Sequence, residues 1–358
     1  MAKVIFILLI LLTVPTSMLI LYPSFTSIDV SPIEVVTLKR PSPKPNVVLQ
    51  SPPVAKTLSN DYHVFQTFNN CGPASLSMAL SYFNIIVSQT DLGNELRPYQ
   101  NSQGDNDDKS VTLEELGRKA SEYGFITYHR PAGNPQLIKQ FIAYDMPIIT
   151  RTWTKPDEDI GHYRVIKGYD DHLSEFIQDD SLQGKNLHFS YEYFDSLWKA
   201  FNYEYLVLVP PDKNLIAQTI LGQDTDDQFS WNKAAEISLT QLSRNPNDIY
   251  ARFNLVVAYY HTGQYQKSVA EFEKIEANLP FRTLWYQIEP ILAYYKLGDF
   301  TRVFEITNKI LNNHNRAFSE LYILRGRIYQ SQNNFELAEQ EFENAKLYNR
   351  NLDLNMTF

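Results

Sequence analysis

The spacing of apolar residues changes period twice along the chain. Apolar positions recur at helical intervals from Ser75 to Tyr82, and further helical patterns follow up to about residue 146. From there to Val209, short apolar runs are typical of strands, and from Trp231 onward the helical period returns. This pattern predicts an α+β domain with its helices before an antiparallel sheet, followed by an all-α region.

Local signals set the limits of the elements in the α+β domain, which we place at residues 60–211. Thr112 and Glu115 form a capping-box pattern for a helix that ends at Gly124, and Asn134-Pro135 begins the next helix. The strands are predicted at residues 147–150, 162–169, 175–178 and 205–209.

The all-α region repeats with a shift of 35 residues. The segments Gly263-Gln264-Tyr265, Gly298-Asp299-Phe300 and Asn333-Asn334-Phe335 each place a turn-forming residue two positions before an aromatic one. This pattern resembles the tetratricopeptide repeat, which implies an all-α solenoid over residues 231–350 that recruits a protein partner. A generic helical bundle is the alternative, and residues 212–230 are predicted to be a connector.

An uncharged apolar run, Val4–Tyr22, follows Lys3 near the N-terminus. Its length suits either an uncleaved membrane anchor or a cleaved signal peptide within residues 1–26. Residues 27–59 are rich in proline and predict an extended linker. The expected location is the cell membrane, with a single N-terminal pass and an extracytoplasmic body. If the run is cleaved, the expected protein is secreted or periplasmic.

Composition narrows the classes of partner. The formal net charge is −9 and no basic stripe is present, which argues against a nucleic-acid partner. The chain holds one cysteine and therefore forms no intramolecular disulfide. A free thiol in an exported protein is exposed to oxidation, so its presence suggests a chemical use.

Cys71 is the centre of the candidate chemistry. It lies where an irregular stretch gives way to the first predicted helix, and the positive end of a helix dipole favours the thiolate. A buried structural cysteine is the alternative. Among the seven histidines, His162 follows Gly161 at the start of a predicted strand, from where it can face a helix N-terminus across a cleft.

These stretches together resemble a known family. Gln66, Cys71-Gly72-Pro73-Ala74, the histidine strand ending in Gly168-Tyr169-Asp170, and Asp180-Ser181 occur in family order. They resemble papain-like cysteine peptidases of the bacteriocin-processing, double-glycine type, and more narrowly the stand-alone extracytoplasmic relatives of that type. The resemblance spans about residues 61–209 and implies an α+β papain-like fold.

The resemblance also implies a role for each matching residue. Cys71 is the nucleophile, and His162 is the general base and then the acid that protonates the leaving amine. The Gln66 side-chain amide donates to the oxyanion beside the Cys71 N–H. Asp180 accepts a hydrogen bond from the second imidazole nitrogen. Asp179 is the alternative, because strand alternation directs only one of the two toward His162.

No cofactor or metal is implied by this chemistry. The acidic segment Gly104–Asp108 lacks the spacing and the glutamate of a calcium loop, so we interpret it as a solvated loop. The acidic segment Trp153–Gly161, directly before His162, predicts a mobile flap at the cleft edge or a solvated hairpin tip. As a flap, it would disfavour acidic substrates.

The function predicted is a membrane-tethered or secreted cysteine peptidase that cleaves peptide (amide) bonds through a thioester, with helical repeats that recruit a protein substrate or partner. A catalytically silent papain-like domain that acts with the repeats as a scaffold is the alternative. Amidase or transpeptidase action on cell-wall peptide is a third. The sequence shows no transporter segments and no phosphate-binding loop, so a bacteriocin leader is not carried over as substrate.

Overall fold

The computed structural model describes residues 47–99, 111–156, 158–313, 315–356 and 358. Residues 47–358 form one unit by their contacts. The predicted anchor or signal segment, most of the predicted linker and the acidic loop at 104–108 lie outside the described residues. None of the described helices combines the length and apolar character that crossing a membrane requires.

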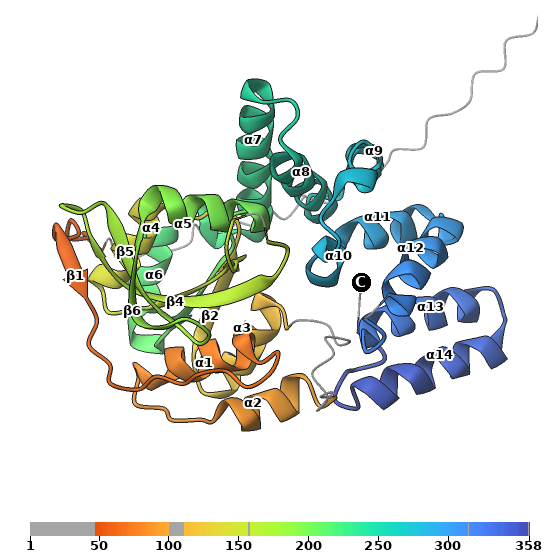
Figure 1. Cartoon of the computed structure of the whole chain (residues 1–358), viewed down its shortest axis with the longest axis horizontal. Helices are drawn as coiled ribbons and strands as arrows, with labels where there is room; N and C mark the ends of the chain where they lie inside the picture. Colours follow the sequence, from red (N-terminus) through yellow and green to blue (C-terminus); the bar gives the residue numbers. More distant parts are fainter. Residues whose placement is uncertain (1–46, 100–110, 157, 314, 357) are drawn as a thin grey trace, which may run out of the picture. The chain divides into compact units, whose positions relative to one another are not determined.

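An antiparallel sheet forms the centre of the first half of the described chain (Figure 1). Its strands follow the order β2-β7-β3-β4-β5-β6, and β1 pairs with the end of β4. The central strands β3, β4, β5 and β7 are those that the sequence predicts. The seven strands of the described residues are β1 (Ala55–Thr57), β2 (Ile126–Arg130), β3 (Ile148–Trp153), β4 (Gly161–Asp170), β5 (Glu175–Asp180), β6 (Gly184–Ser190) and β7 (Tyr205–Val209).

Helices cover both faces of this sheet. Successive strand residues point to opposite faces, so Ile149 and Val165 pack with α1 and α3, whereas Ile148 and Ile166 pack with α4 and α5. Thr112 forms the predicted capping box with Glu115 at the start of α3. The helices of this half are α1 (Cys71–Ser81), α2 (Gln89–Leu96), α3 (Leu113–Glu122), α4 (Pro135–Ala143), α5 (Tyr191–Trp198) and α6 (Asn214–Leu221).

The structure corrects the predicted limits of the domain in two places. Residues 55–57, within the predicted linker at 27–59, form β1 and pair with residues 168–170 of β4. Residues 212–230, predicted as a poorly patterned connector, hold α6 and the start of the next helix. Buried Ala217 and Leu221 of α6 pack on the same core as α4, so this segment is part of the fold.

The second half of the chain is helical, as predicted. Helices that are neighbours in sequence contact one another in pairs, with α7 on α8, α8 on α9, α11 on α12 and α13 on α14. A short helix, α10 (Thr283–Tyr286), interrupts the middle of the region. The remaining helices are α7 (Asp227–Arg244), α8 (Ile249–His261), α9 (Tyr265–Glu273), α11 (Glu289–Leu297), α12 (Phe300–Asn312), α13 (Ser319–Ser331) and α14 (Phe335–Tyr348).

Three turns of this region have the same geometry at the predicted spacing of 35 residues. Gly263, Gly298 and Asn333 each adopt a left-handed backbone, with φ of 72°, 77° and 59°. In each turn, the N–H of the following residue donates to the carbonyl five positions earlier, over 2.8–3.0 Å. Left-handed residues of this kind end a helix with little strain when they are glycine or asparagine. The repeat in sequence therefore corresponds to a repeat in turn structure.

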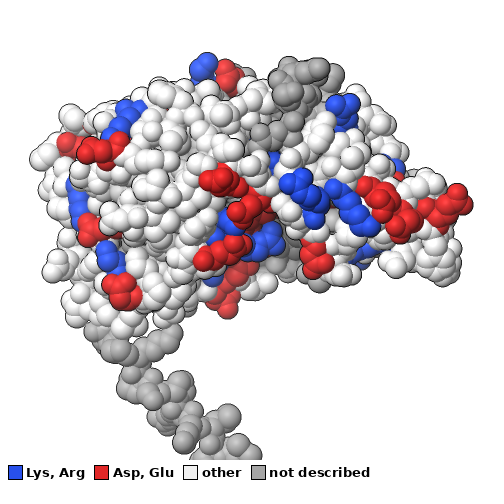
Figure 2. All heavy atoms as spheres, turned by 90° about the horizontal axis from the view of Figure 1, so that it is seen from below, with Lys and Arg blue, Asp and Glu red and all other residues white. Residues whose placement is uncertain are grey.

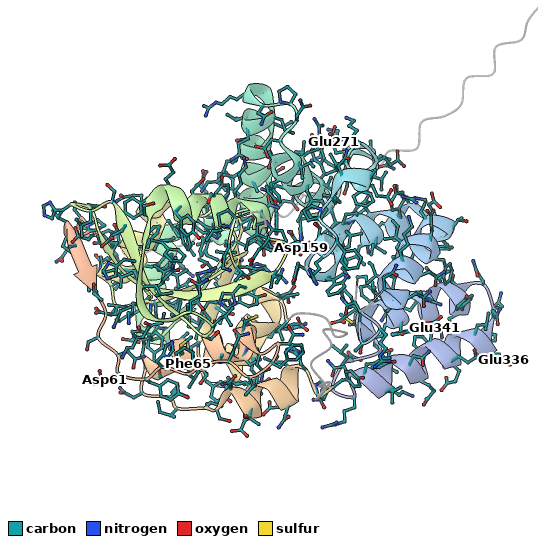
Figure 3. All side chains as sticks on the ribbon, in the orientation of Figure 1. Asp61, Phe65, Asp159, Glu271, Glu336 and Glu341 are labelled. Atoms are coloured by element: carbon teal, nitrogen blue, oxygen red, sulfur yellow. The ribbon has the colours of Figure 1, made fainter. Side chains whose placement is uncertain are left out.

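The hairpin between β3 and β4 packs against the helical region. Trp153 stacks edge-on against Phe201 and Tyr286, with ring centroids 4.7 Å and 5.8 Å away. A Cβ at Gly161 would lie 2.9 Å from the Tyr286 ring, so the close approach of that ring requires glycine. Asp159, labelled in Figure 3, pairs with Arg282 at 2.6 Å. The contacts with Tyr286 and Arg282 fix the strand that carries His162 against residues that follow it by more than a hundred positions.

Charged side chains of both signs are interleaved on the face shown in Figure 2. Lys and Arg there lie beside Asp and Glu rather than in a separate patch. The described residues on this face therefore form no basic stripe of the kind that tracks a phosphate backbone.

Candidate active site

The start of α1 holds Cys71. Asn69 has a left-handed backbone (φ 57°), which turns the chain, and Asn70 occupies the N-cap position before Cys71. The Asn70 side chain is buried and donates to Thr67 Oγ1 over 2.8 Å, which fixes the entry to the helix. Cys71 is the first residue of the helix and is 6% exposed, so its thiol lies where the helix dipole favours negative charge.

His162 and Asp180 come from neighbouring strands of the sheet. His162 is the second residue of β4, and Asp180 is the last residue of β5. His162 Nε2 lies 2.8 Å from Asp180 Oδ1, and both side chains are buried. Because Nε2 donates to Asp180, Nδ1 remains for the hydrogen bond between the imidazole and the Cys71 side chain.

Asp180 is held as a carboxylate by several donors. Burial alone would raise its pKa, but the hydrogen bond from His162, the charges of His162 and Arg164, and the Gln183 N–H lower the pKa to about 2. Oδ1 also accepts from the N–H groups of Leu182 and Gln183 at 2.7 Å and 2.9 Å. Arg164 Nε lies 3.1 Å from Oδ2. The carboxylate is therefore fixed in place and charged at neutral pH.

Arg164 also holds the start of the hairpin. It is buried, and its guanidinium donates to the carbonyls of Trp153 and Thr154, both at 2.9 Å, and to Thr152 Oγ1. One side chain thus connects Asp180 to the end of β3. Arg164 could not be recognised from the sequence, because a cation in the middle of a strand pattern does not by itself indicate a buried side chain that joins two strands.

The Cys71 thiol and the His162 imidazole each shift the pKa of the other. Burial would raise the pKa of Cys71, but the hydrogen bond and charge of His162, the charge of Arg97 and the Gly72 N–H together lower it. Burial would lower the pKa of His162, but its hydrogen bonds and attraction to Asp180 and Cys71 raise it. Both directions favour a thiolate–imidazolium pair, which is a reactive form of cysteine. Arg97, buried after α2, was not found from the sequence.

Asp179 faces away from His162. Its Oδ1 lies 2.6 Å from Lys167 Nζ, and its Oδ2 accepts from the Tyr82 hydroxyl over 3.0 Å. Strand alternation predicts this separation of Asp179 from Asp180. Asp179 is fully buried in an ion pair with Lys167.

Gln66 lies beside Cys71 in the cleft, and Ser181 fixes its amide. The Ser181 hydroxyl donates to Gln66 Oε1 over 2.8 Å, and the Gln66 N–H donates to the Ser181 carbonyl over 2.7 Å. With Oε1 taken by Ser181, the NH₂ end of the amide remains available to donate within the cleft. The sequence placed Ser181 beside Asp180 but gave no signal for this contact.

A cleft of about 430 Å³ opens over the thiol. Its rim includes three exposed apolar side chains, Phe68, Ile160 and Leu182. The segment predicted as a mobile flap is held in place by two contacts. Asp159 forms an ion pair with Arg282, and the Thr154 hydroxyl donates a hydrogen bond to the Ile160 carbonyl across the hairpin. The cleft is lined by Gln66, Thr67, Phe68, Asn69, Cys71, Thr154, Ile160, Gly161, His162, Leu182 and Arg282.

The structure thus brings together the four residues that the sequence singled out, namely Cys71, His162, Asp180 and Gln66. The described residues contain no group of three or more His, Cys, Asp or Glu side chains arranged to hold a metal ion. The arrangement suits attack by a thiolate on an acyl carbon, with a nearby imidazolium to protonate the leaving group.

Residues 49–206 match the model of the Peptidase_C39 like family. One similar solved structure is a C39-like peptidase from Bacillus anthracis, with 18% identity and a TM-score of 0.35, covering 43% of this chain and 97% of that one. The peptidase domain of Streptococcus ComA, a bifunctional ABC transporter of a quorum-sensing pathway, is 23% identical with a TM-score of 0.33, covering 41% of this chain and 96% of that one.

A third similar structure is a double-glycine-motif protease from an AMS/PCAT transporter in complex with a leader peptide. It is 20% identical with a TM-score of 0.32, and the match covers 42% of this chain and 91% of that one. No curated protein matches the chain.

Proposed function

We propose that this protein is a cysteine peptidase that hydrolyses peptide bonds, with Cys71 as nucleophile, His162 as base and acid, and Asp180 as the group that orients His162. The observation that carries the proposal is the connected set of Cys71, His162 and Asp180, of which Cys71 and His162 line one cleft and Asp180 is buried behind His162. The match of residues 49–206 to a peptidase family supports the same chemistry.

The proposed reaction has two steps. The Cys71 thiolate attacks the carbonyl carbon, a C–S bond forms, and the oxyanion receives hydrogen bonds from the Cys71 N–H and the Gln66 side-chain amide. His162 then gives its proton to the leaving nitrogen, the C–N bond breaks, and a thioester remains. Water, deprotonated by His162, attacks the thioester and releases the acid product and the thiolate.

The parts outside the cleft have proposed roles as well. The helical region, whose three matching turns support its resemblance to tetratricopeptide repeats, recruits a protein substrate or partner. The apolar run at Val4–Tyr22 delivers the body to the outside of the membrane, as an anchor or as a cleaved signal. A silent scaffold is the outcome if the thiol proves inert.

The pH dependence of Cys71 alkylation by iodoacetamide tests the proposal. Because His162 lowers the pKa of the thiol, we expect the rate in the full chain to be high already near pH 6. In His162→Ala burial, the attraction of Arg97 and the Gly72 N–H remain, and without His162 we expect burial to dominate, so the rate should rise only above pH 8. The mass of the intact protein after labelling reports alkylation at a single site, because Cys71 is the only cysteine in the chain.

His188→Ala is the matched control, since His188 is exposed on β6 and pairs with Glu175 away from the cleft. We expect its alkylation profile to match that of the wild type. If the wild type and His162→Ala both react only above pH 8, the thiol is inert and the peptidase proposal is wrong.

A further inference from the structure

Arg282 enters the cleft from the helical region. It precedes α10 and lines the same cleft as Cys71 and His162. Its backbone N–H and Nη1 both contact the Asp159 carboxylate, at 3.1 Å and 2.6 Å. The residue therefore belongs to the wall of the cleft, although it lies 123 positions after Asp159 in the chain.

The Arg282 guanidinium is held in place yet retains binding capacity. It lies over the rings of Trp285 and Phe281, at 5.3 Å and 5.9 Å from their centroids. Within the described residues its Nε is buried and has no hydrogen-bond partner, whereas the side chain as a whole is 32% exposed and part of it lines the cleft. A planar guanidinium fixed in this way loses little conformational freedom when it binds an anion.

The charge of the described cleft wall is cationic. Besides Cys71 and His162, the lining side chains other than Arg282 are apolar or uncharged, and none of the lining residues is an aspartate or a glutamate. Asp159, which the sequence analysis counted as part of an acidic flap, is paired with Arg282 and does not line the cleft. An incoming carboxylate therefore meets no carboxylate in the cleft lining, and it shares the Arg282 guanidinium with Asp159, which is bound to Nη1 from behind the lining.

We propose that Arg282 binds a carboxylate of the peptide substrate, so that the helical region sets the specificity of the cleft. The carboxylate belongs either to an Asp or Glu side chain near the cleaved bond or to the C-terminus of the substrate. Arginine binds both through the same charge-assisted hydrogen bonds. This inference rests on the proposed peptidase function, and it reverses the expectation from sequence that acidic substrates are disfavoured.

Paired alkylating probes test the inference on the full chain. N-bromoacetylglycine and N-bromoacetylglycinamide differ by a terminal carboxylate. The α-amides of N-bromoacetyl-Glu and N-bromoacetyl-Gln differ by a side-chain carboxylate. In each reaction Cys71 Sγ forms a bond to carbon and bromide leaves. We expect the carboxylate probe of at least one pair to react about tenfold faster than its neutral partner, the size expected for a hydrogen bond to a charged group.

Arg282→Gln should lower that ratio at least about fivefold, whatever its effect on the absolute rate with either probe. Arg282→Lys, which keeps the charge, should retain part of the preference. The pair that loses its preference identifies the source of the carboxylate. A wild-type ratio near one for both pairs, or a ratio unchanged in Arg282→Gln, would overturn the inference.

Two further variants separate ligand binding from structural support. Asp159→Asn frees the guanidinium and should maintain or raise the carboxylate preference. If it lowers the preference as much as Arg282→Gln does, Arg282 only holds the hairpin and the inference is wrong. Arg302→Gln removes another paired arginine of the helical region, bound to Glu276 and Glu305, and should change nothing. The ratio is independent of the pH profile that tests the thiolate, so the two proposals fail separately.

Discussion

Cys71→Ala is expected to lower kcat/KM for peptide cleavage by a factor on the order of 10⁴ or more, because no other group in the cleft can form the thioester. The free energy of unfolding should change by less than about 1 kcal/mol, since the substitution removes one sulfur atom from a site that already opens to the cleft. Mass spectrometry of a peptide mixture before and after incubation measures the loss, and thermal melting measures stability.

Cys71→Ser provides the control for shape. A serine hydroxyl keeps the size of the side chain and its hydrogen bond, but it does not ionise at neutral pH beside a single histidine as a thiol does. We expect it to be as inactive as Cys71→Ala. Cleavage that persists at the wild-type rate in either variant would show that the activity does not arise from this cleft, and the scaffold function would then be favoured.

Asp180→Asn and Asp179→Asn form a matched pair in which only the first is expected to lower kcat. Each substitution leaves a buried cation without its carboxylate, Arg164 in the first case and Lys167 in the second, so each should destabilise the fold by about 3–5 kcal/mol. Only Asp180→Asn disturbs the orientation and charge of His162. We expect it to lower kcat about 100-fold or more, while Asp179→Asn retains near-wild-type kcat per folded molecule.

The alkylation profile separates these two variants independently of turnover. Asp180 raises the pKa of His162, so in Asp180→Asn the imidazolium should lose its proton at lower pH and no longer hold the thiolate there. The profile of Asp179→Asn should match the wild type. If Asp179→Asn does not fold, the double variant Asp179→Asn/Lys167→Met removes both charges and serves instead. Equal losses of kcat in both variants would contradict the assignment of Asp180.

The sequence predicted the central strands and missed the edges of the sheet for a physical reason. β3, β4 and β7 are inner strands with continuous buried runs, and the inner strand β5 buries four of its six residues, so each has enough buried positions to show a pattern. β2 and β6 are the two edges of the sheet order and bury little, with Tyr128 the only buried residue of β2. An edge strand that is half in water has few apolar positions from which its period can be recognised.

The residues of the candidate site also fall into two groups, those that the sequence indicates and those that it does not. Cys71, His162, Asp180 and Gln66 lie at recognisable local positions, at a helix start, at a strand start, at a strand end and five residues before the cysteine. Ser181 and Arg164 act through contacts that have no local signature. Arg282 lies far along the chain in a stretch without a clear pattern, so its place in the cleft depends on how the two halves pack. Long-range contacts of this kind cannot be derived from periodicity.

Because Trp153 packs against Tyr286, the first half of this chain is difficult to express alone or to join to another domain. Tyr286 covers Trp153 and Phe201, and the buried Arg151 guanidinium lies 5.3–5.6 Å from the rings of Phe201, Tyr163 and Tyr286. A gene shortened to encode only the first half would remove Tyr286 and leave Trp153, Phe201 and the Arg151 guanidinium facing water, as an exposed apolar patch directly beside the cleft. A chimera that exchanges the helical half for another therefore needs a new hairpin face as well as a new linker.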